Sequence, residues 1–202
     1  MSGVEIKHYG SVPPNLREIY RYAGGRAGDE ALEESVKESL SELDGRLSFS
    51  VCYREFDLKK EGDLLDLGFA KTDSKHLSDL LCDCDRILLF AATIGSMPDR
   101  LLLKYGRISP VKALTIDAVG SERVESLCEL FVKERAKDYQ KEGFFLTPRF
   151  SPGYGDLPLA LQKEIFLALT PEKHLGLTLG ESLLMWPCKS VTALAGIGKR
   201  KK

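Results

Sequence analysis

The residues best suited to chemistry lie in a short segment rich in proline and glycine, residues 147–158. Arg149 carries a planar guanidinium that can hold a carboxylate through two parallel hydrogen bonds, and Tyr154 offers an aromatic ring and a hydroxyl. The prolines fix φ, while Gly153 and Gly155 can adopt backbone conformations closed to other residues. The segment therefore predicts a rigid, sharply turned loop that binds a small anionic ligand with a flat ring.

The residue types alone leave a second interpretation open. In it, the segment is a surface loop in which Arg149 pairs with an internal carboxylate and Tyr154 packs as a lid. A resemblance favours ligand binding: the run Arg149-Phe-Ser-Pro-Gly153-Tyr154 resembles the Arg-x-x-x-Gly-Tyr motif of the activation domain of cobalamin-dependent methionine synthase, which binds S-adenosylmethionine.

Two further segments resemble the same family. Residues 178–187 read Thr-Leu-Gly-Glu-Ser-Leu-Leu-Met-Trp-Pro and are followed by Ser190-Val191, which is similar to the family's Thr-x-Glu-Ser-x-x-Met-Trp-Pro and Ser-Val stretch. Residues 117–125 read Asp-Ala-Val-Gly-Ser-Glu-Arg-Val-Glu, similar to a pattern of stand-alone versions of the domain. Three motifs in the family's order, between residues 86 and 194, are stronger evidence than any one of them.

The resemblance implies a fold and a function. The fold would be α+β, a twisted antiparallel sheet flanked by helices, with one long helix before the ligand loop. The function would be that of an accessory subunit in methionine biosynthesis, which binds S-adenosylmethionine for the reductive remethylation of oxidised cobalamin. The cobalamin would be held by a separate methionine synthase that lacks its own activation domain, and a flavodoxin-like or other electron donor would supply the electron. The chain is expected to have no activity alone, and no catalytic or metal-binding residue is assigned.

The motif match also implies which residues bind the cofactor. Arg149 would take the carboxylate of S-adenosylmethionine, Ser151 would contact the ligand through its backbone, and Gly153 and Tyr154 would line it. The family's acidic partner lies on the long helix before the motif, and Glu125 is the best match in this chain.

Other interpretations remain open for the acid and for the function. Glu122 and Glu129 are rivals of Glu125, and all three could equally form a solvated helix face. The same fold could serve as a reactivation or scaffolding subunit for another corrinoid methyltransferase. A free-standing enzyme is the third alternative, but the chain has no glycine-rich strand-to-helix loop followed by an acidic residue about twenty positions on, as a doubly wound methyltransferase would have.

Composition is typical of one cytoplasmic protein without a nucleic-acid or membrane partner. The 202 residues are 43% hydrophobic and carry a net charge of −1, which does not favour a nucleic-acid surface. No run of 18 apolar residues is present and the N-terminus has no apolar signal core, so neither a membrane span nor export is indicated. In the cytoplasm the five cysteines are expected to be reduced thiols.

Two cysteine positions invite a chemical interpretation. Cys82-Asp-Cys84 has too short a spacing for a zinc knuckle and no nearby residue to complete a tetrahedral set. Cys188 follows Trp186-Pro187 and would be reactive if Lys189 lowered its pKa, although packing in the core is favoured over this. Trp186, the sole tryptophan, is expected to be buried.

Hydrophobic periodicity outlines the elements that position these residues. The long helix carries an apolar stripe at Val124, Leu127, Cys128, Phe131 and Val132, and Gly120 interrupts it where a strand or a ligand would approach closely. Helices are predicted at residues 15–22, 29–43, 97–105, 110–140 and 159–169, and strands at 47–53, 86–93, 177–184 and 189–195, with a charged turn at 58–66 and a Met-Trp-Pro turn at 185–187.

The resemblance also divides the chain into parts. Residues 1–85 form an α+β portion with a weak family match. Residues 86–198 form the activation-domain-like portion with the ligand loop, and residues 199–202 are a basic tail.

Overall fold

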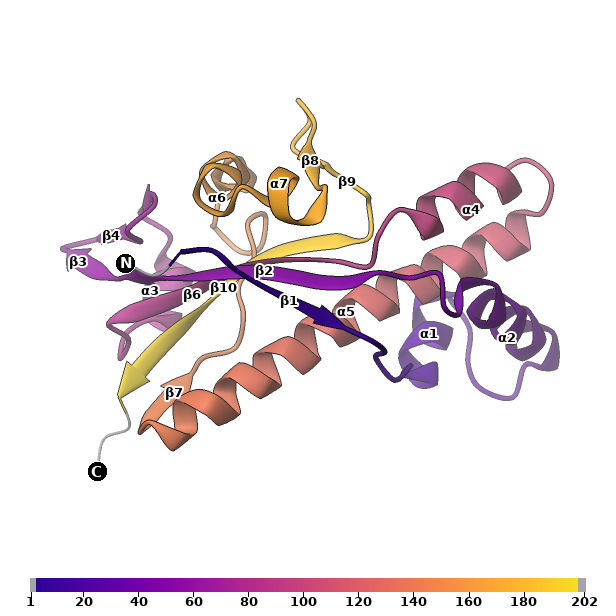
Figure 1. The fold of residues 1–202 in the computed structure, drawn as a ribbon, viewed down its shortest axis with the longest axis horizontal. Coiled ribbons are helices and arrows are strands. Elements are labelled where there is room, and N and C mark those ends of the chain that lie inside the picture. Colours follow the sequence, from indigo (N-terminus) through magenta and orange to yellow (C-terminus); the bar gives the residue numbers. More distant parts are fainter. Residues whose placement is uncertain (1–2, 200–202) are drawn as a thin grey trace.

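A single five-stranded antiparallel sheet organises the chain in the computed structural model, which describes residues 3–199 (Figure 1). The sheet contains strands from both of the portions expected from the sequence, residues 1–85 and 86–198. Strand β6, from the second portion, pairs with β2 of the first portion on one side and with β10 on the other. Of the expected basic tail, only Lys199, the last residue of β10, lies within the described residues. In sheet order the strands are β1 (Glu5–Tyr9), β2 (Phe49–Asp57), β6 (Arg86–Thr93), β10 (Ser190–Lys199) and β7 (Phe144–Leu146).

The central strand β6 is buried on both faces, as its continuous apolar sequence predicts. Because successive side chains of a strand point to opposite faces, it contributes to two hydrophobic cores. Leu89 and Ala91 join the core on one face, and Leu88, Phe90 and Ala92 join the core on the other.

The long helix α5 (Pro110–Lys141) crosses one face of this sheet (Figure 1). The stripe predicted from the sequence packs there: Val124, Leu127, Cys128 and Phe131 are buried and Val132 is half-buried against them. The Phe131 ring lies 5.1 Å, between centroids, from Tyr53 of β2 and 5.1 Å from Phe90 of β6. These contacts fix the rotation of α5, and thereby which of its side chains point away from the sheet core.

Three helices pack around the first half of α5: α1 (Leu16–Tyr22), α2 (Glu30–Leu43) and α4 (Met97–Tyr105). All three begin where the sequence predicts. Side chains cap two of them: the Asn15 side chain accepts a hydrogen bond from the Glu18 amide, and the Asp29 side chain accepts one from the Leu32 amide. Their shared core contains Ile19, Val36, Leu43, Leu101, Ile116 and Val119.

Other parts of the chain approach α5 closely at Gly120. A Cβ added there would lie 3.1 Å from Cγ of Lys189 and 3.3 Å from Cβ of Pro98. The close approach expected at this glycine is therefore made by the residue that precedes β10 and by α4.

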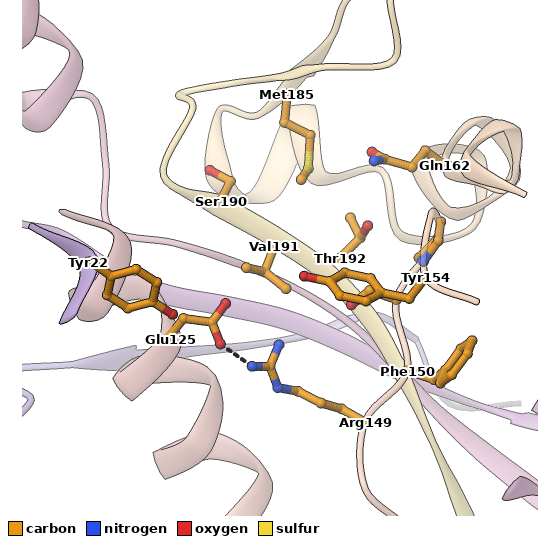
Figure 2. A pocket seen from close by; sticks show the side chains of 12 residues that line it. Tyr22, Glu125, Arg149, Phe150, Tyr154, Gln162, Met185, Ser190, Val191 and Thr192 are labelled. Carbon is orange, nitrogen blue, oxygen red and sulfur yellow. Dashed lines mark hydrogen bonds and ion pairs between the residues drawn. The ribbon is translucent and has the colours of Figure 1, made fainter. Parts of the chain in front are cut away.

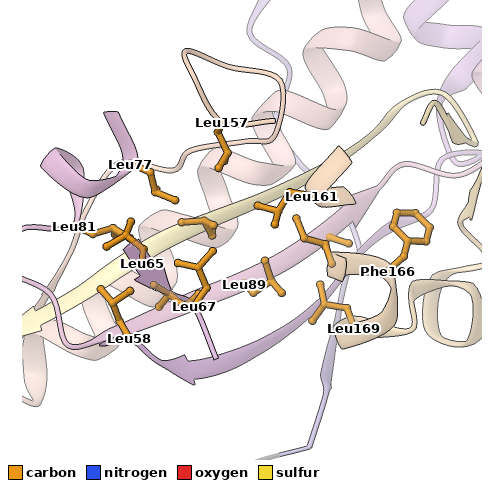
Figure 3. Close-up of a cluster of buried hydrophobic side chains, with 14 of the residues drawn as sticks. Leu58, Leu65, Leu67, Leu77, Leu81, Leu89, Leu157, Leu161, Phe166 and Leu169 are labelled. Atoms are coloured by element: carbon orange, nitrogen blue, oxygen red, sulfur yellow. The ribbon is translucent and has the colours of Figure 1, made fainter. Parts of the chain in front are cut away.

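The second core lies on the opposite face of the sheet, beneath α3 (Lys75–Leu80), α6 (Gln162–Leu169) and α7 (Pro171–Leu175) (Figures 1 and 3). The helix predicted at 159–169 is found as a 3-10 turn, η1 (Leu159–Leu161), continued by α6. Its inward side chains Leu161, Ile165, Phe166 and Leu169 are buried with Leu77, Leu81, Leu89 and Leu157.

The charged turn expected at residues 58–66 is wrong. The segment forms β3 (Lys59–Glu61) and β4 (Leu64–Asp66), which join β5 (Lys71–Thr72) in a small antiparallel sheet. Its charged side chains face outward, while Leu65 is buried against the second core. The charges dominate the composition of the segment and conceal that one face is apolar.

The strand and turn predicted between 177 and 187 are also wrong in detail. The strands are β8 (Thr178–Leu179) and β9 (Met185–Trp186), so Met185 and Trp186 lie in a strand rather than in a turn. The turn is at 180–184, where the Gly180 amide donates to the Leu184 carbonyl. Trp186 is 46% exposed and not buried, because this small hairpin stands outside the main sheet and covers only part of the ring.

Within residues 3–199, no helix is both long enough and apolar enough to cross a lipid bilayer.

Candidate functional site

The proline- and glycine-rich segment forms a loop that hydrogen bonds to β10. The Thr147 amide donates to the Gly196 carbonyl, and Phe150 and Leu194 exchange two backbone hydrogen bonds of 2.8 and 2.9 Å. Gly153 and Gly155 have φ values of +89° and +55°, the left-handed region that favours glycine. The sharply turned backbone predicted from the sequence is therefore present.

Asp156 ties the far end of the loop to the start of α3. Its carboxylate accepts a hydrogen bond from the Ser74 hydroxyl and one of 2.7 Å from the Lys75 amide. These bonds, led by the Ser74 hydroxyl, hold the pKa of Asp156 below its usual range. The loop is thus held at one end by the sheet and at the other by a helix terminus.

A pocket of about 480 Å³ opens beside this loop (Figure 2). It draws residues from α1, α5, the loop, α6, β9 and β10, which are far apart in the sequence. The lining residues are Tyr22, Glu125, Arg149, Phe150, Ser151, Pro152, Tyr154, Gln162, Met185, Ser190, Val191 and Thr192.

The two charged residues of this lining, Arg149 and Glu125, form an ion pair through one guanidinium nitrogen and one carboxylate oxygen (Figure 2). Burial acts to lower the pKa of Arg149, but neighbouring Cys128 and Glu125 outweigh it and the pKa is raised. Burial also raises the pKa of the Cys128 thiol to about 12, so this thiol is uncharged at neutral pH. Glu125 is therefore the neighbour that raises the pKa of Arg149. Arg149 is therefore a permanent cation beside a carboxylate.

An ion pair of this kind fits both sequence interpretations, since the surface-loop alternative also pairs Arg149 with an internal carboxylate. The pocket is what favours ligand binding. Glu125 occupies a single nitrogen of the guanidinium, and no other described side chain accepts a hydrogen bond from it. The remaining donors are thus available to a ligand that enters the pocket.

Of the three glutamates considered on the long helix, Glu125 alone lines this pocket. Glu122 has only 2% of its side chain exposed and accepts hydrogen bonds from Arg123 at 2.7 and 2.8 Å and from the Asn15 amide at 3.0 Å. Its oxygens are thereby committed to the protein. Glu129 lines a neighbouring acidic hollow that also reaches Glu125.

The loop residues assigned from the motif are divided by the structure. Ser151 and Tyr154 line the pocket with Arg149, and Tyr154 is 70% exposed. Gly153 does not line it. Its amide donates to the Leu157 carbonyl at 2.9 Å, and an added Cβ would lie 3.3 Å from Leu159, so Gly153 shapes the turn.

Several lining residues are not among those predicted from the sequence. Met185, Ser190 and Val191 lie in the motif stretches quoted above, which was a usable signal. Tyr22 reaches the pocket from α1, and nothing in its local sequence indicates this. Gln162 lies inside the helix predicted at residues 159–169, and its local sequence does not indicate a role in the pocket either.

Cys188 differs from both of its predicted roles. The side chain is exposed, so it does not fill the core. Burial of part of the thiol and its hydrogen bond to Asp99 raise its pKa, and Lys189 does not reverse this. Lys189 instead donates to Asp117 at 2.7 Å, which offsets its charge. Within residues 3–199 no group of three or more His, Cys, Asp or Glu side chains is arranged to hold a metal ion.

Comparison with solved structures decides the fold. A crystal structure of the MetH reactivation domain bound to AdoHcy (S-adenosylhomocysteine) superposes with a TM-score of 0.69, covering 99% of this chain and 80% of that one. This chain has the MetH reactivation-domain fold. The identity is 19%, so the superposition establishes the α+β architecture implied by the motif resemblance and not the ligand. No family model matches this chain, and no curated protein matches it.

Proposed function

We propose that this chain binds S-adenosylmethionine and presents its methyl group for the reductive reactivation of oxidised cobalamin on a separate methionine synthase. The observation that carries the proposal is the ion pair of Arg149 and Glu125 at the wall of the pocket. An α-amino acid bears a carboxylate and an ammonium on one carbon, and adjacent opposite charges are the arrangement that binds both. The solved reactivation-domain structure was bound to AdoHcy, the demethylated form of the same ligand.

In this proposal Arg149 binds the carboxylate through the guanidinium donors that Glu125 does not occupy. Glu125 accepts a hydrogen bond from the ammonium, and its negative charge also attracts the positively charged sulfonium. Ser151 and Tyr154 bound the ligand on the loop side. Because the loop is fixed at Phe150 and Asp156, the ligand is held with little further ordering of the protein.

The exposed side of the pocket supports delivery to a partner. Tyr154 and Tyr22, at 70% and 38% exposure, leave the pocket accessible from outside. S-adenosylmethionine supplies the methyl group, and cobalamin on the partner accepts it together with one electron from a flavodoxin-like or other donor. The chain itself positions the ligand and contributes charge, as a cytoplasmic subunit of a methyltransferase complex.

The test combines binding with reactivation. Titration calorimetry is expected to show binding of S-adenosylmethionine and of S-adenosylhomocysteine. Adding the chain to a cobalamin-binding methionine synthase fragment that lacks this domain, with a chemical reductant, is expected to restore methyl transfer in a manner that requires S-adenosylmethionine. If neither S-adenosylmethionine nor S-adenosylhomocysteine binds, the proposed ligand is refuted. If the ligand binds but the chain neither reactivates the methionine synthase fragment nor is retained on it, the proposed partner is refuted.

A further inference from the structure

Among the described residues that line the pocket, Gln162 is the one with a fully buried side-chain oxygen that lacks a hydrogen-bond partner. The residue is 7% exposed, lines the pocket, and its side-chain oxygen has no hydrogen-bond partner among residues 3–199. In Figure 2 the carboxamide points from α6 into the pocket. A buried amide oxygen without a partner costs about 1 to 3 kcal/mol, so a group placed this way indicates a partner that the chain itself does not supply.

The position of this carboxamide is set by the core. Gln162 is the first residue of α6, and its neighbours Leu161, Ile165 and Phe166 are buried against the sheet (Figure 3). Since these contacts fix the helix, the Gln162 side chain leaves the helix in a fixed direction, toward the pocket.

The charges of the pocket indicate which part of the ligand reaches Gln162. Within residues 3–199, the charged residues that line the pocket are Arg149 and Glu125, which are in contact with each other. They accommodate the amino-acid end of S-adenosylmethionine, whose two charges share one carbon. In Figure 2 Gln162 is drawn on the other side of the β10 ribbon from Arg149, and it lines the same pocket as Met185 and Tyr154. The neutral, aromatic end of the ligand is therefore the part that remains for this side.

We infer that the Gln162 carboxamide recognises the adenine base of the ligand by hydrogen bonding its 6-amino group, an inference that rests on the proposed function. A carboxamide presents one acceptor and one donor side by side, which match the 6-amino group and N7 of adenine. Tyr154 offers a ring on which a base can stack. Gln162 is thus a specificity-determining residue that selects an adenine nucleoside over one with a 6-oxo base.

The experiment compares S-adenosylhomocysteine with S-inosylhomocysteine, in which an oxygen replaces the 6-amino group. Calorimetry on the full chain is expected to show that the wild type binds the adenosyl compound about tenfold more tightly, because the inosyl oxygen cannot donate to the amide oxygen. Gln162→Leu, of similar size but without the amide, is expected to lose this preference. Gln162→Glu keeps an acceptor oxygen and is expected to retain it. Lys163→Ala, exposed on the same helix, serves as the matched control.

The outcomes separate this inference from the proposed function. If Gln162→Leu keeps the wild-type preference, or the wild type shows none while binding both compounds, the inference is overturned and the proposed function stands. If the wild type binds neither compound, both are overturned. Should Gln162→Leu fail to fold, as judged by thermal unfolding, the wild-type preference together with its retention in Gln162→Glu decides the question.

Discussion

The ion pair of Arg149 and Glu125 makes a prediction that depends on which half of the ligand is present. S-adenosylhomocysteine contains both an amino acid and an adenosine, whereas 5′-methylthioadenosine keeps the adenosine and the sulfur but lacks the amino acid. If the ion pair binds the amino acid, its removal weakens the binding of S-adenosylhomocysteine and leaves the binding of 5′-methylthioadenosine unchanged.

The magnitude follows from the geometry. Arg149 and Glu125 have 26% and 34% of their side chains exposed, so water screens the interaction only in part. Hydrogen bonds to charged groups contribute about 1.5 to 3 kcal/mol, and a loss of about 2 to 3 kcal/mol in Arg149→Ala corresponds to about 30- to 150-fold weaker binding of S-adenosylhomocysteine. Glu125→Gln keeps an acceptor and loses the charge, for which about fivefold is expected.

Titration calorimetry with both compounds on the wild type and the two variants is the assay. Binding of 5′-methylthioadenosine is expected to change less than twofold in either variant. The fold is expected to be retained, because a partly exposed ion pair contributes at most about 1 kcal/mol to stability. Wild-type affinity of Arg149→Ala for S-adenosylhomocysteine would refute the assignment. Equal weakening of both compounds would show that the substitution changed the shape of the pocket instead.

Three further predictions concern the loop and the long helix. Asp156→Ala is expected to speed amide hydrogen exchange in the loop, because the acceptor of Ser74 and of the α3 amides is lost; unchanged exchange would contradict this. Folding lowers the pKa of Asp156, so its carboxylate stabilises the loop at pH values above the unfolded pKa of about 3.9. This stabilisation is lost as the pH falls through the lower pKa of the folded state. The loop amides of the wild type are therefore expected to be protected at pH 5 and not in stronger acid. Glu122→Ala is expected to lower the free energy of unfolding by about 3 to 5 kcal/mol, because it leaves Arg123 buried without its ion-pair partner. Glu129→Ala is the control and is expected to change this free energy little. If thermal or denaturant unfolding shows the same loss in both variants, the Glu122–Arg123 ion pair does not have the predicted role.

Local signals predicted much of the fold. Asn15 and Asp29 are helix caps in the structure, and β6 and α4 have the bounds that their sequences predict. Each of these elements is determined within a few residues by a cap or by one apolar pattern. Errors arose where burial depends on distant segments. Leu65 is buried only because the small sheet folds onto the second core, and Trp186 is exposed because its hairpin stands outside the main sheet.

The candidate site shows the same division. Arg149, Ser151 and Tyr154 lie within six residues of one another, so a motif could place them together, and the structure brings Glu125 to them across the long helix. Tyr22 and Gln162 reach the pocket from helices whose sequences carry no sign of it, because their direction is set by packing against α5 and the sheet. Such residues emerge only once the tertiary arrangement is known.

The most direct test of the central claim is a crystal structure of the chain grown or soaked with S-adenosylhomocysteine. The account predicts density for the ligand in the pocket, with its carboxylate on the Arg149 guanidinium and its ammonium on Glu125. A pocket that stays empty at saturating ligand, or a ligand bound elsewhere on the chain, would contradict it.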